Sequence, residues 1–415
     1  MAGGQFIYGK TNYFYQSFYE NLLKESIRDD IEILAWIPCD TIPAVTDYIQ
    51  THFSLFQTTN LTICLMTSKF QIQAVIRQFL SILGIDSSQI LDIYQLYLHK
   101  LPIKQYQQII RSCTAPLDGM IFGISHGQAG ILEDLLPGNA LNFCSSSQDI
   151  YFNTKILSAL AEESYNAICH TKYIIFDMFD YTYFNFDTIL TNECQNYLTA
   201  NGFFCENRHD YHHSQSVDDI NHCLTEIFAL RSDTSAFQRF LTLFPQIHCP
   251  DVQEYQNEYR KLMRPDTTLH QDAIAAYLSP STPVFSSIQR HVYEPTIQFQ
   301  IANFAEFLHL VYCINPNIKV IGVLLPKYYV VEETEQTVNQ LWKPYFENIV
   351  SSFQEKYANF TFCDLKNLTD ISHNPDFYQD LTHLNFEGAR HLTNYIVSAL
   401  SLIHISEPTR PEPIS

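Results

Sequence analysis

Apolar runs of strand length alternate with stretches of helical periodicity through the first hundred residues. This alternation predicts parallel strands joined by crossover helices. The predicted strands occupy residues 5–9, 31–37 and 61–67, with a further apolar run at 90–98. Helices are predicted over residues 12–24 and 69–83. The second of these stops before Gly84, a residue type favoured just beyond a helix C-terminus.

A second series of the same kind begins near Asp118. Its predicted strands are 120–124, 172–179, 318–325 and 360–365, with a short strand, a polar turn and a helix start in 141–152. Helices are predicted over 297–314, 333–357 and 385–400. The polar, mostly helical stretch at about 194–272 is interpreted as an insertion or cap. The chain is therefore expected to be α/β, with a Rossmann-like parallel sheet in 1–112 and a three-layer α/β/α domain in 113–400.

Composition excludes several partners. The 415 residues include 24 Lys and Arg against 44 Asp and Glu, a net charge of −20, which argues against nucleic acid and anionic membranes. The eleven cysteines form no C-x-x-C pair, which is typical of reduced cytosolic proteins. No apolar stretch reaches the roughly 18 residues of a membrane span, and no signal peptide is evident. We expect a cytoplasmic protein; the oligomeric state stays open.

The C-terminal segment SLIHISEPTRPEPIS, residues 401–415, resembles the translation of a sequencing adapter. We expect these residues to be foreign to the natural protein and the natural C-terminus to be missing. The segment is excluded from the predicted domains.

Ser125 is the first candidate for chemistry. It lies in GISHG, directly after an apolar strand and before a predicted helix. A serine in this position is a possible nucleophile, because helix N–H groups stabilise developing negative charge there. It is equally a favoured helix N-cap. The G-x-S-x-G pattern also matches the nucleophile elbow of α/β-hydrolases.

A second candidate motif, DLTHLNFEG, lies far along the chain. Asp380 and His383 are three residues apart, so one loop can hold both. The carboxylate can then accept from the imidazole Nδ1–H and leave Nε2 free as a general base. Taken alone, a non-catalytic interpretation is preferred, because such pairs occur by chance and His383 could simply cap a helix. The shared loop differs from α/β-hydrolases, whose acid and histidine normally stand on separate loops.

The order of these motifs resembles the SGNH (GDSL-like) hydrolase superfamily, over roughly residues 118–400. The closest pattern is that of divergent members encoded in surface-polysaccharide clusters. The matching stretches are Gly123-Ile-Ser125 through Gly130-Ile131, Asn142 through Ser146-Ser147-Gln148-Asp149, Pro326-Lys-Tyr328 and Asp380 through Asn385. The resemblance implies a flavodoxin-like fold for this domain.

The resemblance also implies roles. Ser125 would be the nucleophile, His383 the base and Asp380 its orienting acid. The oxyanion would be held by the backbone N–H groups of Ser125 and Ser146, while the superfamily's asparagine donor has no clear counterpart in residues 176–186. Gly127 is interpreted as incidental.

The predicted function is a serine esterase or O-acyltransferase acting on a carbohydrate or other acylated small molecule in surface-polysaccharide biosynthesis. No cofactor is predicted. The alternative is a non-catalytic glycan-binding or scaffold protein on a degenerate hydrolase fold. Both readings rest partly on fold-level analogy.

Two further stretches of the sequence contain candidate binding residues. The N-terminal segment resembles the small Rossmann-like domain that precedes surface-glycan biosynthesis proteins, but only Gly9 of the glycine fingerprint is present. A structural or partner-binding role is therefore favoured over dinucleotide binding. His209, His212 and His213 could hold zinc, but they lack a clear fourth ligand in a polar stretch. A solvated surface is the preferred interpretation, and no metal is predicted.

Overall fold

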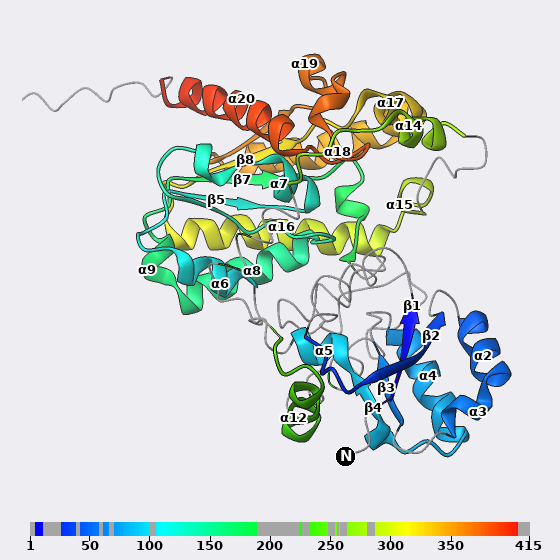
Figure 1. Ribbon diagram of the computed structural model, residues 1–415. Coiled ribbons are helices and arrows are strands. Elements are labelled where there is room, and N and C mark those ends of the chain that lie inside the picture. Colours follow the sequence, from blue (N-terminus) through cyan, green and yellow to red (C-terminus); the bar gives the residue numbers. More distant parts are fainter. Residues whose placement is uncertain are drawn as a thin grey trace, which may run out of the picture. The chain divides into compact units, whose positions relative to one another are not determined.

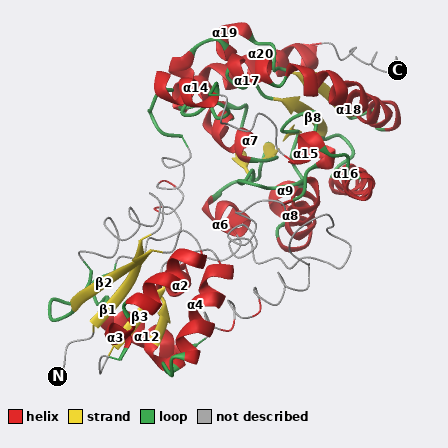
Figure 2. Cartoon of the chain, turned by 90° about the vertical axis from the view of Figure 1, so that its right-hand side faces the viewer, coloured by secondary structure: helices red, strands yellow, loops and turns green. Residues whose placement is uncertain are grey.

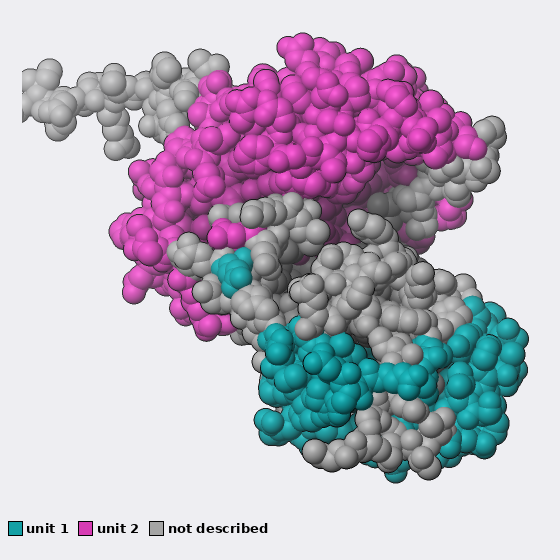
Figure 3. Space-filling model, viewed as in Figure 1, with its two compact units in different colours: residues 1–105, 198–206, 215–255 teal, residues 106–197, 207–214, 256–415 magenta. Residues whose placement is uncertain are grey.

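The structure is a computed structural model in which the chain divides into two compact units (Figure 3). The residues described are 5–10, 26–38, 42–57, 61–65, 70–98, 105–188, 225, 229, 233–247, 254, 257, 264–279 and 287–405. Unit 1 comprises 1–105, 198–206 and 215–255, and unit 2 comprises 106–197, 207–214 and 256–415. The predicted helix over 12–24 lies outside the described residues, as does most of the predicted insertion.

Unit 1 contains a four-stranded parallel sheet in the order β2-β1-β3-β4. Its strands are β1 (Gln5–Lys10), β2 (Glu32–Pro38), β3 (Leu61–Leu65) and β4 (Ile90–Asp92). Its helices are α2 (Ile42–Thr51), α3 (Phe53–Phe56), α4 (Phe70–Ile82), α5 (Ile93–Leu98), α12 (Thr234–Leu243) and the 3₁₀ turn η2 (Ser87–Gln89). The sheet is parallel as predicted. In this sheet β3 pairs with β1. In the dinucleotide-binding order 3-2-1-4, the third strand instead pairs with the second and is not next to the first.

The apolar run at 90–98 divides into a strand and a helix. Asp92 ends β4, and its carboxylate accepts from the Gln95 backbone N–H at 2.9 Å. This satisfies a donor at the start of α5, which a side chain must do because the first helical N–H groups have no partner within the helix. Gly84 follows α4 with φ +79°, as expected of a residue beyond a helix end.

Unit 2 contains a five-stranded parallel sheet in the order β6-β5-β7-β8-β9. Its strands are β5 (Gly119–Phe122), β6 (Ala140–Asn142), β7 (Tyr173–Asp177), β8 (Lys319–Leu324) and β9 (Phe360–Asp364). Every neighbouring pair is parallel. This order is the doubly wound, flavodoxin-like one, and the protein is thus an α/β protein with parallel sheets, as predicted.

Helices cover both faces of the unit 2 sheet. The helices that matter most for the site and the sheet are α7 (Ser125–Gly130), α8 (Ile150–Glu163), α16 (Glu294–Ile314), α17 (Tyr329–Thr334), α18 (Gln336–Lys356) and α20 (Phe386–Ile405). Figures 1 and 2 show α20 on one side of the strands and α8 and α16 on the other. Consecutive strand residues point to opposite faces: Ile175 packs in the cluster that contains Leu392 of α20, whereas Phe176 packs edge-on against Phe307 of α16 at 4.9 Å.

The remaining elements are short. They are α6 (Gln105–Ser112), α9 (Tyr165–Ile168), α14 (Gln271–Tyr277), α15 (Ser287–Arg290), α19 (Thr369–Ser372) and the 3₁₀ turns η3 (Glu133–Leu135), η4 (Tyr183–Asn185) and η6 (Pro375–Phe377). The helix expected over 333–357 is interrupted at Glu335, between α17 and α18. Helix α20 runs to Ile405, into the segment predicted to be a foreign tail. Within the described ranges, no helix combines the length and apolarity needed to cross a bilayer.

Candidate active site

The turn between β5 and α7 places Ser125 at the carboxyl edge of the unit 2 sheet. Gly123 in this turn has φ +142°, and a Cβ there would lie 2.5 Å from the Cβ of Asp177. Both facts favour glycine. Ile124 occupies the N-cap position and Ser125 is the first residue of α7. The N-cap interpretation of Ser125 is therefore wrong.

His383 lies between the other two predicted residues. Its Nε2 is 2.8 Å from Ser125 Oγ, and its Nδ1 is 2.9 Å from Asp380 Oδ2. The structure thus brings Ser125, His383 and Asp380 together in one hydrogen-bonded line. Burial opposes the charge of Asp380, but the hydrogen bond and charge of His383 outweigh it and lower the pKa of this carboxyl below its ordinary 3.8. An ionised Asp380 holds the Nδ1–H tautomer, in which Nε2 can accept the hydroxyl proton of Ser125.

The loop that carries the pair is fixed by its own backbone and by the start of α20. Asp380 Oδ1 accepts from the Thr382 and His383 backbone N–H groups, both at 2.8 Å. Asn385 Oδ1 accepts from the Gly388 N–H at 3.0 Å. A Cβ on Gly388 would lie 2.2 Å from the Phe377 carbonyl oxygen. The asparagine and glycine of the motif are therefore needed for the loop's shape.

Asp177 is a residue of this site that the sequence reasoning missed. It ends β7 and is fully buried. Its Oδ2 accepts from the N–H groups of Gly127 at 2.6 Å and Ile124 at 3.4 Å, and its Oδ1 accepts from Phe179 N–H at 3.0 Å. The carboxylate of a neighbouring strand thus takes the place of an N-cap side chain for α7. Burial raises the pKa of Asp177 to about 7, against the lowering effect of these hydrogen bonds.

Gly127 is not incidental. A Cβ at this position would lie 2.8 Å from both the Cβ of Asp177 and the Sγ of Cys144. Any larger residue would displace one of these buried groups. The glycine two residues after Ser125 is therefore required by the approach of Asp177 to the helix N-terminus, and the α/β-hydrolase elbow is not needed to explain it.

His126 packs directly against the proposed base. The rings of His126 and His383 stack with centroids 4.6 Å apart at 27°, and the Phe179 ring lies 5.1 Å from His126. Only 7% of His126 is exposed, and neither ring nitrogen has a hydrogen-bond partner among the described residues. Burial and then the neighbouring His383 charge lower the pKa of His126 well below its ordinary 6.5. His126 therefore presents a neutral ring to His383.

Arg264 holds the other end of α7. Its Nε donates to the Gln128 carbonyl at 3.0 Å, and its Nη2 donates to the Ile131 carbonyl and to Glu133 Oε2, both at 2.9 Å. A cation at a helix C-terminus satisfies carbonyls that have no partner within the helix. Glu133 is buried and the Arg264 side chain is only 9% exposed, so this pair holds the C-terminal end of α7 while Asp177 holds the N-terminal end.

The predicted oxyanion residue Ser146 lies in the loop after β6. Its hydroxyl is 3.4 Å from Gln128 Oε1, one helical turn beyond Ser125. Among the described residues, no hydrogen bond joins Ser146 to Ser125 or His383, and the backbone N–H groups of Ser125 and Ser146 have no acceptor. Both groups are therefore available as donors, and their role as an oxyanion pair stays a prediction.

The other candidates contribute less. His209, His212 and His213 lie outside the described residues, and within the described ones no cluster of His, Cys, Asp and Glu is suited to a metal ion. Burial raises the pKa of Cys144 well above its ordinary 9.0, which makes this thiol inert.

Comparisons with known proteins add little to this geometry. No family model matches the chain, and no curated protein matches it. Two solved structures are similar at a low level. A Streptococcus pneumonia protein provisionally described as a platelet activating factor is 10% identical, with a TM-score of 0.35 over 74% of this chain and 92% of that chain. A Bacteroides fragilis protein provisionally described as an acylhydrolase is 11% identical, with a TM-score of 0.31 over 72% of this chain and 95% of that chain. Similarities at this level define neither an activity nor a substrate for the protein.

Proposed function

We propose that unit 2 is a serine esterase in which Ser125 is the nucleophile and His383 the general base. The observation that carries this proposal is the position of His383, with Nε2 2.8 Å from Ser125 Oγ and Nδ1 2.9 Å from Asp380. These distances are within the range required for proton transfer by a positioned base. A serine that served only structure would not need an imidazole held by a carboxylate.

The proposed reaction has two halves. Ser125 Oγ attacks the ester carbonyl as its proton passes to His383 Nε2, and the negative oxygen that forms faces the Ser125 backbone N–H. The imidazolium then gives the proton to the departing alcohol oxygen, which leaves an acyl-serine. Water or another hydroxyl next attacks the acyl carbon and gives its proton to His383. The imidazolium then returns a proton to Ser125 Oγ as the bond between Oγ and the acyl carbon breaks, which releases the acid or the new ester. Asp380 stabilises the imidazolium in both halves.

The finer part of the proposal concerns substrate and acceptor. The motif resemblance favours an acyl group carried by a carbohydrate, as in surface-polysaccharide biosynthesis. Attack by water would make the protein an esterase, and attack by a sugar hydroxyl would make it an O-acyltransferase. Both outcomes use the same acyl-serine.

The direct test is labelling by a fluorophosphonate probe, which reacts with an activated serine. Wild type should be labelled at Ser125, identified by peptide mass spectrometry, and Ser125→Ala should not be labelled. Ser352→Ala is the matched control, because Ser352 is an exposed serine on α18. His383→Ala should label at least about a hundredfold more slowly, the usual contribution of a general base.

The contrary result is equally clear. The assignment of Ser125 as the nucleophile would be refuted if folded wild-type protein reacted no faster than Ser125→Ala with the probe and with p-nitrophenyl acetate. It would favour the alternative of a non-catalytic glycan-binding or scaffold protein.

A further inference from the structure

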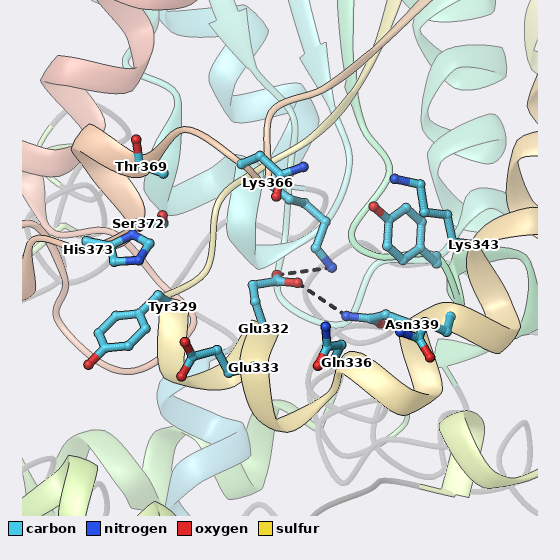
Figure 4. Close-up of a pocket in the computed structure, with 13 residues that line it drawn as sticks. Tyr329, Glu332, Glu333, Gln336, Asn339, Lys343, Lys366, Thr369, Ser372 and His373 are labelled. Carbon is cyan, nitrogen blue, oxygen red and sulfur yellow. Dashed lines mark hydrogen bonds and ion pairs between the residues drawn. The ribbon is translucent and has the colours of Figure 1, made fainter.

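A polar pocket of about 660 Å³ lies in unit 2, apart from the residues of the proposed triad (Figure 4). It is formed by the segment after β8, the first turns of α18, the loop after β9 and Tyr181, which follows β7. Because carboxyl ends of parallel strands meet at one edge of a sheet, this pocket and Ser125 share the same edge. This edge is where open α/β sheets bind ligands.

The floor of the pocket carries charges that are already paired. Lys366 is 2% exposed, and its Nζ lies 2.7 Å from Asp180 Oδ1 and 3.1 Å from Glu332 Oε1. The other Glu332 oxygen accepts from Asn339 Nδ2 at 3.2 Å, as the dashed lines in Figure 4 show. Two acidic and two basic side chains occur among the thirteen that line the pocket, so their formal charges cancel. Such a floor does not favour an anion, because Asp180 and Glu332 already neutralise Lys366. The other lining lysine, Lys343, lies 3.7 Å from Asp364 and 3.8 Å from Glu347.

The walls are suited to hydroxyl groups. None of the thirteen lining residues has an aliphatic side chain. Six of them are neutral amides or alcohols, namely Gln336, Asn339, Gln340, Asn367, Thr369 and Ser372. Amides and alcohols both donate and accept, and so do the hydroxyls of a polyol. An apolar ligand would leave these groups unpaired, which costs binding free energy.

One end of the pocket also offers flat rings. Tyr329 and His373 stack with their planes 8° apart and centroids 4.6 Å apart, and both are drawn in Figure 4. Aromatic rings present apolar faces beside polar edges, which matches the C–H face and hydroxyl rim of a sugar ring. Tyr181 is held differently, because its hydroxyl donates to Asp364 Oδ2 at 2.6 Å and Lys366 Nζ lies 4.6 Å from its ring centroid.

We infer that this pocket binds a neutral, polyhydroxylated molecule, in the form of the sugar part of a glycan. The inference rests on the proposed function only in treating the bound sugar as part of an ester that reacts at Ser125. Sugar binding itself does not require Ser125 to be a nucleophile. The pocket would then hold a sugar unit of the substrate while the acyl group reaches the serine from the same edge of the sheet.

The test is saturation-transfer NMR with glucose, galactose and N-acetylglucosamine as separate probes, on Ser125→Ala protein. Glucuronate and inorganic phosphate serve as anionic comparisons. In the same background, Gln336→Ala with Gln340→Ala removes two exposed amides of the pocket, and Gln354→Ala removes an exposed amide of the same helix outside it. At least one neutral sugar should bind, and the double substitution should weaken it about tenfold. Gln354→Ala should leave binding unchanged.

Three results would overturn the inference: no binding of any of the three sugars, tighter binding of glucuronate or phosphate, or equal binding by the pocket variant and the Gln354→Ala control. Fluorophosphonate labelling of proteins with an intact Ser125 separates this from failure of the proposed function. Sugar binding without labelling would refute the proposed esterase activity and support the sugar-binding pocket. Labelling without sugar binding would support the esterase activity and refute the sugar-binding pocket.

Discussion

Asp177→Asn is the substitution that most directly tests how the candidate site is held. The change keeps the size of the side chain and removes its titration. In the native chain both carboxylate oxygens accept, one from Gly127 and Ile124 and the other from Phe179. An asparagine has one oxygen, so its NH₂ group must face a backbone N–H on one side. We expect α7 to lose part of its anchoring and labelling of the nucleophile to slow at least about tenfold.

The stability effect has a definite pH dependence. Burial raises the pKa of Asp177 from 3.8 to about 7 in the folded protein. The folded chain therefore binds more protons than the unfolded chain between these values, and wild-type stability falls as pH rises through this window. Each pH unit within it corresponds to about 1.4 kcal/mol. From pH 5 to pH 8 the wild type should thus lose about 3 kcal/mol relative to Asp177→Asn, which does not titrate.

The assay is urea unfolding of both proteins at pH 5 and pH 8, read by circular dichroism. The unfolding free energy of the wild type minus that of Asp177→Asn should fall by about 3 kcal/mol between pH 5 and pH 8. Asp134→Asn is the matched control, because Asp134 is an exposed carboxylate close behind α7. A difference that does not change with pH, or that changes equally for the control, would refute the raised pKa and the burial argument behind it.

Substitutions at three further positions test the same helix. His126→Phe keeps the ring that stacks on His383, so its labelling rate should stay within about threefold of wild type. His126→Ala removes the ring and loosens the orientation of His383, so labelling should be about tenfold slower. An equal loss of labelling rate in both variants would show that the ring nitrogens of His126 matter, and not only the stacking. Arg264→Met leaves Glu133 buried without its cation and should lower the free energy of unfolding in urea by about 3–5 kcal/mol. An unchanged urea midpoint would contradict the role of Arg264 in holding α7. Gly127→Ala places a Cβ 2.8 Å from two buried groups and should cost about 1–3 kcal/mol of unfolding free energy. Gly130→Ala, whose nearest neighbour is 3.4 Å away, is its matched control, and equal effects of the two would contradict the packing argument.

Much of the unit 2 fold could be predicted because β5, β6, β7 and nearly all of β8 are buried, whereas β9 is only partly buried. In a sheet covered on both faces, strands become continuous apolar runs such as YIIFD in β7, which stand out in a sequence. Helix ends were harder, because side chains set them locally. Asp92 starts α5 inside an apolar run, and Glu335 separates α17 from α18 while its carboxylate approaches Lys327 at 3.3 Å. The Asp92–Gln95 contact spans three residues inside a run that has the apolar pattern of a single strand, and the Lys327–Glu335 contact spans eight residues, so the apolar pattern reveals neither.

Some residues of the candidate site could likewise be predicted from the sequence, and others could not. Ser125 and the Asp380–His383 pair stand in short motifs that are weak when taken alone; their order along the chain and the resemblance to SGNH hydrolases single them out. Asp177 was missed because its partners are 50 and 53 residues earlier in the chain, on the neighbouring strand's turn. Only the strand order makes them neighbours. The available signal was an acidic residue closing an apolar strand, where the carboxyl edge of a parallel sheet gathers polar groups.

The position of Asp177 also bears on what this edge of the sheet can accept. Strands β5 and β7 are adjacent, and the connections after them run to opposite sides, which makes their carboxyl ends the switch point where doubly wound folds bind ligands. In many such folds the first helix offers its free N–H groups to a phosphate. Here two of the N–H groups at the start of α7 face a buried carboxylate that belongs to the protein itself. Because these two N–H groups already donate to Asp177, a phosphate or carboxylate ligand would find them occupied. The Ser125 N–H has no acceptor among the described residues, which leaves one donor for the single oxygen of an ester carbonyl. We therefore expect this turn to suit the acyl chemistry proposed for Ser125 better than phosphate binding, for a reason that does not depend on the motif.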